Sequence, residues 1–109
     1  MSEKVSGLLK QYKCEVEKEF GDYSVRMLVF GSYARGDFGG DSDLDIMILV
    51  NMSQEKISSY TNRIYDMTYD FEEEFEMEIN PVIQSMAVFE YWKGVYPFFM
   101  NVEKEGIAV

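Results

Sequence analysis

The sequence predicts an α/β (α+β) fold, a small mixed β-sheet flanked by helices, in one domain that covers residues 1–109. Two short apolar runs, Val25–Phe30 and Leu44–Val50, have the length and composition of buried strands. Apolar residues recur at helical spacing before the first run and after the second. A chain of 109 residues is long enough for one hydrophobic core and too short for two.

The first predicted element is an amphipathic helix over residues 3–20. Its apolar positions lie three or four residues apart, and Gly21 and Asp22 follow as a stop signal. The apolar positions are Val5, Leu8, Leu9, Tyr12, Val16 and Phe20.

The second strand begins with two carboxylates, Asp43 and Asp45, that are two residues apart. Side chains alternate between the faces of a strand, so both aspartates point the same way. Because apolar residues continue along both faces, we expect a strand buried on both sides and open only at its start. Leu44, Ile46, Ile48 and Val50 take the opposite face, and Met47 and Leu49 continue the acidic face.

The remaining chain predicts a long helix and an aromatic segment. The helix starts near Asn51 or Ser53, either of which can cap it, and runs to Phe75, with the glutamates from Glu72 to Glu76 at its solvated end. The aromatic segment 87–100 is interpreted as a small helix closing the core or as a surface for a partner protein or a second copy (a homo-oligomer).

The most informative pattern joins the two predicted strands. Gly31 and Ser32 end the first strand, and Asp43-Leu44-Asp45 follows ten residues later. Gly31 lets the backbone approach a ligand, and Ser32 with the following turn offers donors to phosphate oxygens. Two aspartates on one face repel each other, and Mg²⁺ with its preference for oxygen ligands removes that conflict. The alternative for the acidic pair alone is an ordinary solvated loop.

Two other motifs fail on residues that their chemistry requires. Gly31 and Gly36 have Walker A spacing, but Asp37 stands where that loop needs lysine. Asp41, Asp43 and Asp45 begin like a calcium loop, yet its sixth and twelfth positions are Ile46 and Met52.

Arg35 leaves two roles open. It could neutralise charge on a triphosphate, or it could pair with Asp37 or Asp41 and hold the loop. We favour the structural role.

Composition narrows the function classes. The net charge of −10 makes direct nucleic-acid binding unfavourable and favours a basic protein partner. The absence of histidine excludes His-activated nucleophiles and leaves carboxylates as acid–base groups. We expect no membrane span and no secretory signal, and the single cysteine, Cys14, is expected to be a plain thiol in a reducing, cytoplasmic setting.

These residues resemble the minimal nucleotidyltransferases of the DNA polymerase β superfamily, in the antitoxin-like stand-alone form. Their G-S-x10-D-x-D pattern is matched without a gap from Gly31 to Asp45. The resemblance extends to Asn80-Pro81 and to the ending from Pro97, so it covers most of the chain, and the first 24 residues are the least diagnostic.

The resemblance implies the nucleotidyltransferase fold and a metal-dependent reaction. A nucleoside monophosphate, AMP from ATP in the antitoxin members, passes from a nucleoside triphosphate to a hydroxyl, and pyrophosphate leaves. Asp43 and Asp45 would hold two Mg²⁺ ions, and Gly31, Ser32 and Arg35 would face the nucleotide. The resemblance further implies a third carboxylate on a neighbouring strand, which in this chain should cover residues 77–84. Glu78 is the first choice for it and Glu76 the second.

The resemblance also implies a partner, a helical HEPN-type ribonuclease toxin that the chain would neutralise by placing AMP on a tyrosine. The alternative is a non-catalytic nucleotide- or metal-binding module that neutralises its partner by binding alone. A third interpretation is a calcium- or nucleotide-binding regulator without chemistry.

Overall fold

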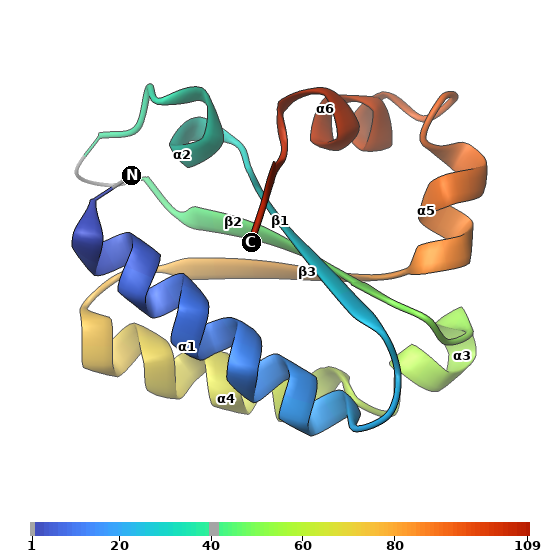
Figure 1. Cartoon of the computed structure of the whole chain (residues 1–109), viewed down its shortest axis with the longest axis horizontal. Helices are drawn as coiled ribbons and strands as arrows, with labels where there is room; N and C mark the ends of the chain where they lie inside the picture. Colours follow the sequence, from blue (N-terminus) through green and yellow to red (C-terminus); the bar gives the residue numbers. More distant parts are fainter. Residues whose placement is uncertain (1, 40–41) are drawn as a thin grey trace.

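The computed structural model describes residues 2–39 and 42–109, and in them a four-stranded sheet has helices on both faces (Figure 1). The strands lie in the order β3-β2-β1-β4, with β1 antiparallel to β2 and β4 and with β2 parallel to β3. The predicted mixed sheet is therefore confirmed. The strands are β1 (Val25–Phe30), β2 (Leu44–Val50), β3 (Ile79–Ser85) and β4 (Ile107–Ala108).

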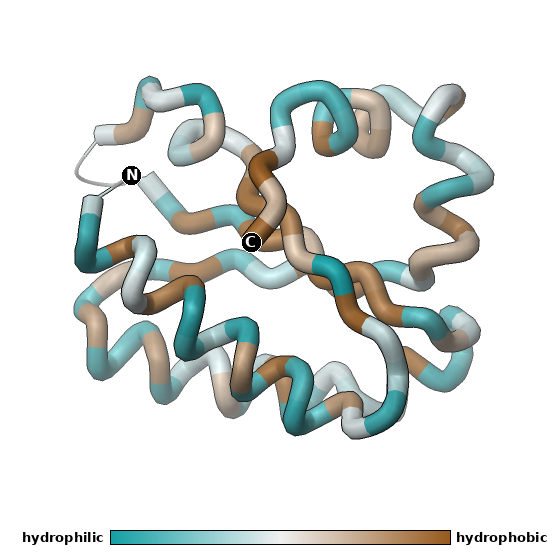
Figure 2. The backbone as a smooth tube through the Cα atoms, viewed as in Figure 1, coloured by the Kyte–Doolittle hydropathy of each residue, from teal (hydrophilic) through white to brown (hydrophobic). Residues whose placement is uncertain are grey.

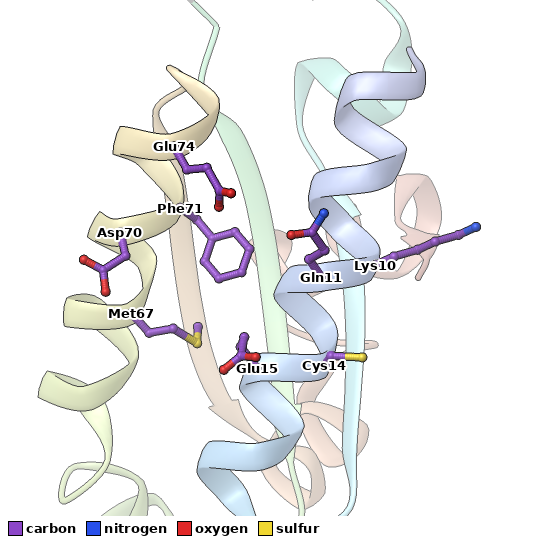
Figure 3. Close-up of a pocket in the computed structure, with 8 residues that line it drawn as sticks. All are labelled: Lys10, Gln11, Cys14, Glu15, Met67, Asp70, Phe71 and Glu74. Carbon is purple, nitrogen blue, oxygen red and sulfur yellow. The ribbon is translucent and has the colours of Figure 1, made fainter.

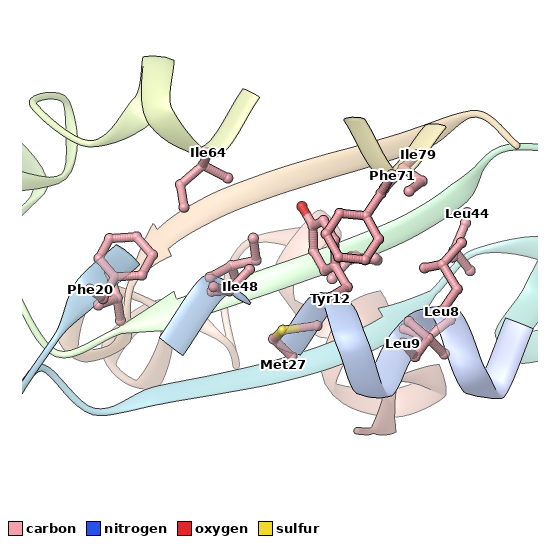
Figure 4. Close-up of a cluster of buried hydrophobic side chains, with 14 of the residues drawn as sticks. Leu8, Leu9, Tyr12, Phe20, Met27, Leu44, Ile48, Ile64, Phe71 and Ile79 are labelled. Carbon is pink, nitrogen blue, oxygen red and sulfur yellow. The ribbon is translucent and has the colours of Figure 1, made fainter. Parts of the chain in front are cut away.

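Helices α1 (Glu3–Phe20) and α4 (Thr61–Phe75) cover one face of the sheet (Figure 4). The helix predicted over residues 3–20 is confirmed, with Ser2 accepting the Val5 N–H at its start and Gly21 at its end. All six apolar positions predicted for it are buried. They pack on the strand side chains predicted for this face, Leu44, Ile46, Ile48 and Val50.

The opposite face of the sheet carries α5 (Met86–Trp92) and α6 (Pro97–Glu105). Met47 and Leu49 of β2 pack there with Leu28, Phe30, Phe89, Phe99 and Val102. Strand β2 is thus buried on both sides, as predicted, and hydrophobic residues concentrate along the central strands (Figure 2). None of the helices within the described residues is both long and apolar enough to cross a bilayer.

The long helix predicted after the second strand is divided in two. Ser53 does cap a helix, α3 (Gln54–Ile57), by accepting the Lys56 N–H at 3.2 Å, but α4 begins only at Thr61. The hydroxyls of Ser58 and Ser59 donate to the carbonyls of Glu55 and Lys56, at 2.6 and 2.7 Å. Such local side-chain bonds compete with continued helix, which explains the break.

The strand predicted over residues 77–84 begins at Ile79 instead. Glu76 takes the left-handed conformation that ends α4, and the Ile79 N–H donates to Glu72 Oε2 at 2.9 Å. Glu72 was predicted to be solvated, and it anchors the start of β3 instead.

Candidate active site

The Gly-Ser turn and the acidic pair lie side by side at one end of the β1–β2 hairpin. Phe30, the last residue of β1, pairs with Asp45 near the start of β2. A short helix, α2 (Ser32–Arg35), begins directly after Gly31. The two halves of the motif, ten residues apart in sequence, therefore meet in space.

Gly31 and Asp45 are in direct contact. Gly31 has a φ of +73°, and a Cβ built on it would overlap Oδ2 of Asp45. A larger residue would suffer both backbone strain and a collision with the carboxylate. The glycine therefore makes room for an acid of the predicted site as well as for a ligand.

Asp45 is half-buried and is held from the other side by Asn80 of β3. The side-chain amide nitrogen Nδ2 of Asn80, which is a donor only, donates a hydrogen bond to Asp45 Oδ1 at 3.0 Å. Asp43 is exposed and immediately precedes β2. Oxygen ligands of this kind are those that Mg²⁺ prefers, so the residue types fit the predicted metal.

Glu78, the predicted third carboxylate, lies just before β3, and its carbonyl accepts the Leu44 N–H at 2.9 Å. It lines an acidic hollow of about 450 Å³ with Glu72, Glu73, Glu76 and Met77. Across residues 2–39 and 42–109, no group of three or more cysteine or carboxylate side chains is placed to hold a metal. Membership of Glu78, or of Glu76, in the metal site stays a prediction, and Asp41 lies outside the described residues.

Arg35 is paired with two carboxylates. Its Nε donates to Asp37 Oδ2 and its Nη1 to Glu105 Oε1, both at 3.2 Å. The hydrogen bond that Arg35 donates to Asp37 and the charges of both acids raise the pKa of Arg35, so the guanidinium stays charged. The predicted pairing with Asp37 is present, whereas the role of Arg35 in nucleotide binding stays a prediction.

Glu105 was not predicted from the sequence. Its Oε1 also accepts the Gly31 N–H at 3.3 Å, so one carboxylate oxygen contacts Gly31, just before α2, and Arg35, the last residue of α2. No local pattern indicates this, because 74 residues separate the two partners. The Ser32 hydroxyl, by contrast, is half-buried and bonds to none of the residues that the structure describes.

A second cavity, of about 510 Å³, opens between α1 and α4 (Figure 3). None of the predicted site residues lines it. Its lining residues are Lys10, Gln11, Cys14, Glu15, Met67, Asp70, Phe71 and Glu74.

Comparison with known proteins shows the family of this chain. The model of the nucleotidyltransferase domain matches residues 9–95. A Methanocaldococcus jannaschii protein named "Putative protein adenylyltransferase" is 32% identical over 94% of this chain and 95% of its own length. Two further proteins of that organism with the same description are each 27% identical, over 90% of this chain and 90% of their own length in one case, and over 76% and 57% in the other.

The fold, the Gly-Ser turn and the acidic pair thus occur in a chain that belongs to the nucleotidyltransferase domain family. It is a transferase enzyme by class, and it spans almost the whole length of two of its adenylyltransferase-named relatives.

Proposed function

We propose that this chain is a Mg²⁺-dependent adenylyltransferase that moves AMP from ATP to a hydroxyl group of a protein. The observation that carries the proposal is the contact of Gly31 with Asp45, which sets the Gly-Ser turn against the acidic pair. The names of the relatives support ATP as the donor and a protein as the acceptor. A protein with this function would work in the cytoplasm, where ATP is present.

Each residue has a defined part in the proposed reaction. Asp43 and Asp45, with Glu78 as the third carboxylate, would hold two Mg²⁺ ions, which neutralise charge on the phosphates when bound. Ser32 would donate to the triphosphate, with Arg35 beside it. The acceptor oxygen forms a bond to the α-phosphorus, the bond to pyrophosphate breaks, and the hydroxyl proton passes to a carboxylate or to water.

The proposed acceptor is a tyrosine of a basic, HEPN-type toxin. The net charge of −10 would speed association with a basic partner. One observation favours the non-catalytic alternative: the side chain beside Asp45 on β3 is the amide of Asn80, not a carboxylate. On that alternative the chain binds nucleotide and neutralises its partner by contact.

The test is incubation of the purified protein with Mg²⁺ and each α-labelled nucleoside triphosphate, with and without a candidate toxin. We expect labelled protein and pyrophosphate with ATP, and a loss of at least about a thousandfold in the Asp43→Asn/Asp45→Asn double variant. The matched control is Asp66→Asn/Asp70→Asn, which removes two exposed aspartates from α4 and should retain transfer.

Two outcomes would count against the proposal. Transfer that survives in the Asp43→Asn/Asp45→Asn variant would remove the acidic pair from the chemistry. Nucleotide binding without transfer, in a protein that still neutralises the toxin, would favour the binding module.

A further inference from the structure

Among the described residues of α6 and β4, Glu105 alone has a side chain that is hydrogen-bonded to the Gly-Ser turn. It lies at the end of α6 and accepts from the Gly31 backbone and from the Arg35 guanidinium. We infer that Glu105 is a positioning residue that fixes the nucleotide-binding turn. The inference rests on the proposed function, and it extends the site to a helix outside the Gly-Ser and Asp-x-Asp motif.

Strand pairing places Glu105 at the turn. In the antiparallel pair of β1 and β4, Val29 lies opposite Ile107. Gly31 follows Val29 by two residues and Glu105 precedes Ile107 by two residues, so the antiparallel direction brings them to the same end of the pair. A Cβ on the intervening Gly106 would overlap the carbonyl of Val102. Phe99 and Val102 bury the inner side of α6. The backbone position of Glu105 is therefore set by the pairing of β4 and by the buried side of α6, and not by the ion pair with Arg35.

A second glutamate on the same helix shows how Glu105 differs from a surface ion pair. Glu103 meets Lys93 at 3.5 Å with its side chain 46% exposed, whereas the Glu105 side chain is 26% exposed. Glu103 has a flexible lysine as its partner, and Glu105 has a backbone N–H and an arginine. Lys93 also pairs with Glu90, at 2.9 Å, so Glu103 belongs to an exposed group of ion pairs. Exposed ion pairs add little, so only the contacts of Glu105 are expected to affect the site.

Arg35 keeps hydrogen-bond donors for a nucleotide after it has paired with Asp37 and Glu105. A guanidinium has five N–H donors in one plane, and the contacts to Asp37 and Glu105 use two. These contacts set the orientation of the plane, so the three unused donors also have fixed directions. Because the Gly31 N–H already donates to Glu105, we expect phosphate oxygens to accept a hydrogen bond from Ser32 instead.

The test compares Glu105→Ala and Glu105→Gln with Glu103→Ala and Glu103→Gln. Binding is measured by calorimetry with Mg²⁺ and α,β-methylene ATP, and transfer by KM and kcat for ATP. We expect Glu105→Ala to raise Kd and KM about tenfold and to change kcat less than about threefold. Glu105→Gln keeps an acceptor oxygen and should fall between wild type and Glu105→Ala, and both Glu103 variants should match wild type.

Amide hydrogen exchange of Gly31, followed by NMR, gives a readout that does not depend on catalysis. Exchange should be faster in Glu105→Ala and unchanged in Glu103→Ala. If wild-type protein binds no nucleotide, the proposed function fails, while this exchange still decides whether Glu105 fixes the turn. Nucleotide binding by Glu105→Ala as tight as in wild type, or unchanged exchange at Gly31, would overturn the inference. Should Glu105→Ala unfold, the isosteric Glu105→Gln variant decides by the same two measurements.

Discussion

The polar groups between α1 and α4 and those at the start of β2 are held in different ways. Between the helices, the buried Tyr12 hydroxyl bonds to Thr68 at 2.7 Å, and Thr68 donates to the Ile64 carbonyl, also at 2.7 Å. At the start of β2, Asp45 accepts a hydrogen bond from the neutral amide of Asn80 and lies against Gly31. The nearby Arg35 is already paired with Asp37 and Glu105. The first group is completed within the protein, whereas the second is the place where we propose that a cation binds.

Of the single substitutions proposed in this section, Gly31→Ala should reduce stability the most, because it disrupts the contact between Gly31 and Asp45. A side chain there has a strained φ and overlaps Asp45, so we expect a loss of about 3 kcal/mol in unfolding free energy and loss of transfer. Chemical denaturation and the labelled-ATP assay measure both.

Gly36→Ala is a matched control for this prediction. Gly36 also has a positive φ, +81°, but no atom lies within 4 Å of where its Cβ would be. It should cost about 1 kcal/mol and retain transfer. Equal losses in the two variants would show that backbone strain alone, and not the Asp45 contact, demands glycine at position 31.

Asn80→Asp tests whether the acidic pair at the start of β2 binds a cation. In the absence of metal, the hydrogen bond to Asp45 becomes a repulsion between two carboxylates, and we expect a loss of about 2 kcal/mol. Because Mg²⁺ takes carboxylate oxygens, most of that loss should be recovered when Mg²⁺ is added. Thermal unfolding in EDTA and in Mg²⁺ measures the difference.

Asn101→Asp, an exposed change of the same type on α6, should show no dependence on Mg²⁺. If Asn80→Asp is destabilised equally in EDTA and in Mg²⁺, the start of β2 does not hold the metal.

How much of this contrast the sequence predicts depends on how local each feature is. The two faces of β2 follow from the two-residue alternation of a strand, and both were predicted correctly. The pairing of Asp45 with Asn80 depends on the register between β2 and β3, and a slip of one residue reverses which side chains share a face. The start of β3 is also anchored by Glu72, which accepts the Ile79 N–H, and the apolar pattern does not show this contact. The contact of Glu105 with Gly31 depends on the pairing of β4 with β1, which brings together residues far apart in sequence.

Tyr12→Phe should have the smallest effect and should be independent of Mg²⁺. Since the Thr68 hydroxyl proton goes to Ile64, Tyr12 is the donor in their hydrogen bond, and its loss should cost about 1 kcal/mol near neutral pH. Burial raises the pKa of Tyr12 to about 12. A tyrosine in the unfolded chain titrates near 10, so between about pH 10 and 12 only the unfolded state releases this proton, and wild-type stability falls as pH rises.

The difference between wild type and Tyr12→Phe isolates this proton, because every other titrating group is common to both proteins. Wild type should be the more stable near neutral pH, and the advantage should vanish near about pH 11, since the loss approaches about 1.4 kcal/mol per pH unit above the unfolded pKa. Urea unfolding at a series of pH values measures the difference. A constant difference up to pH 12 would mean that the phenol is not confined by α1 and α4. A difference that changes with Mg²⁺ would mean that the two polar regions are coupled rather than separate.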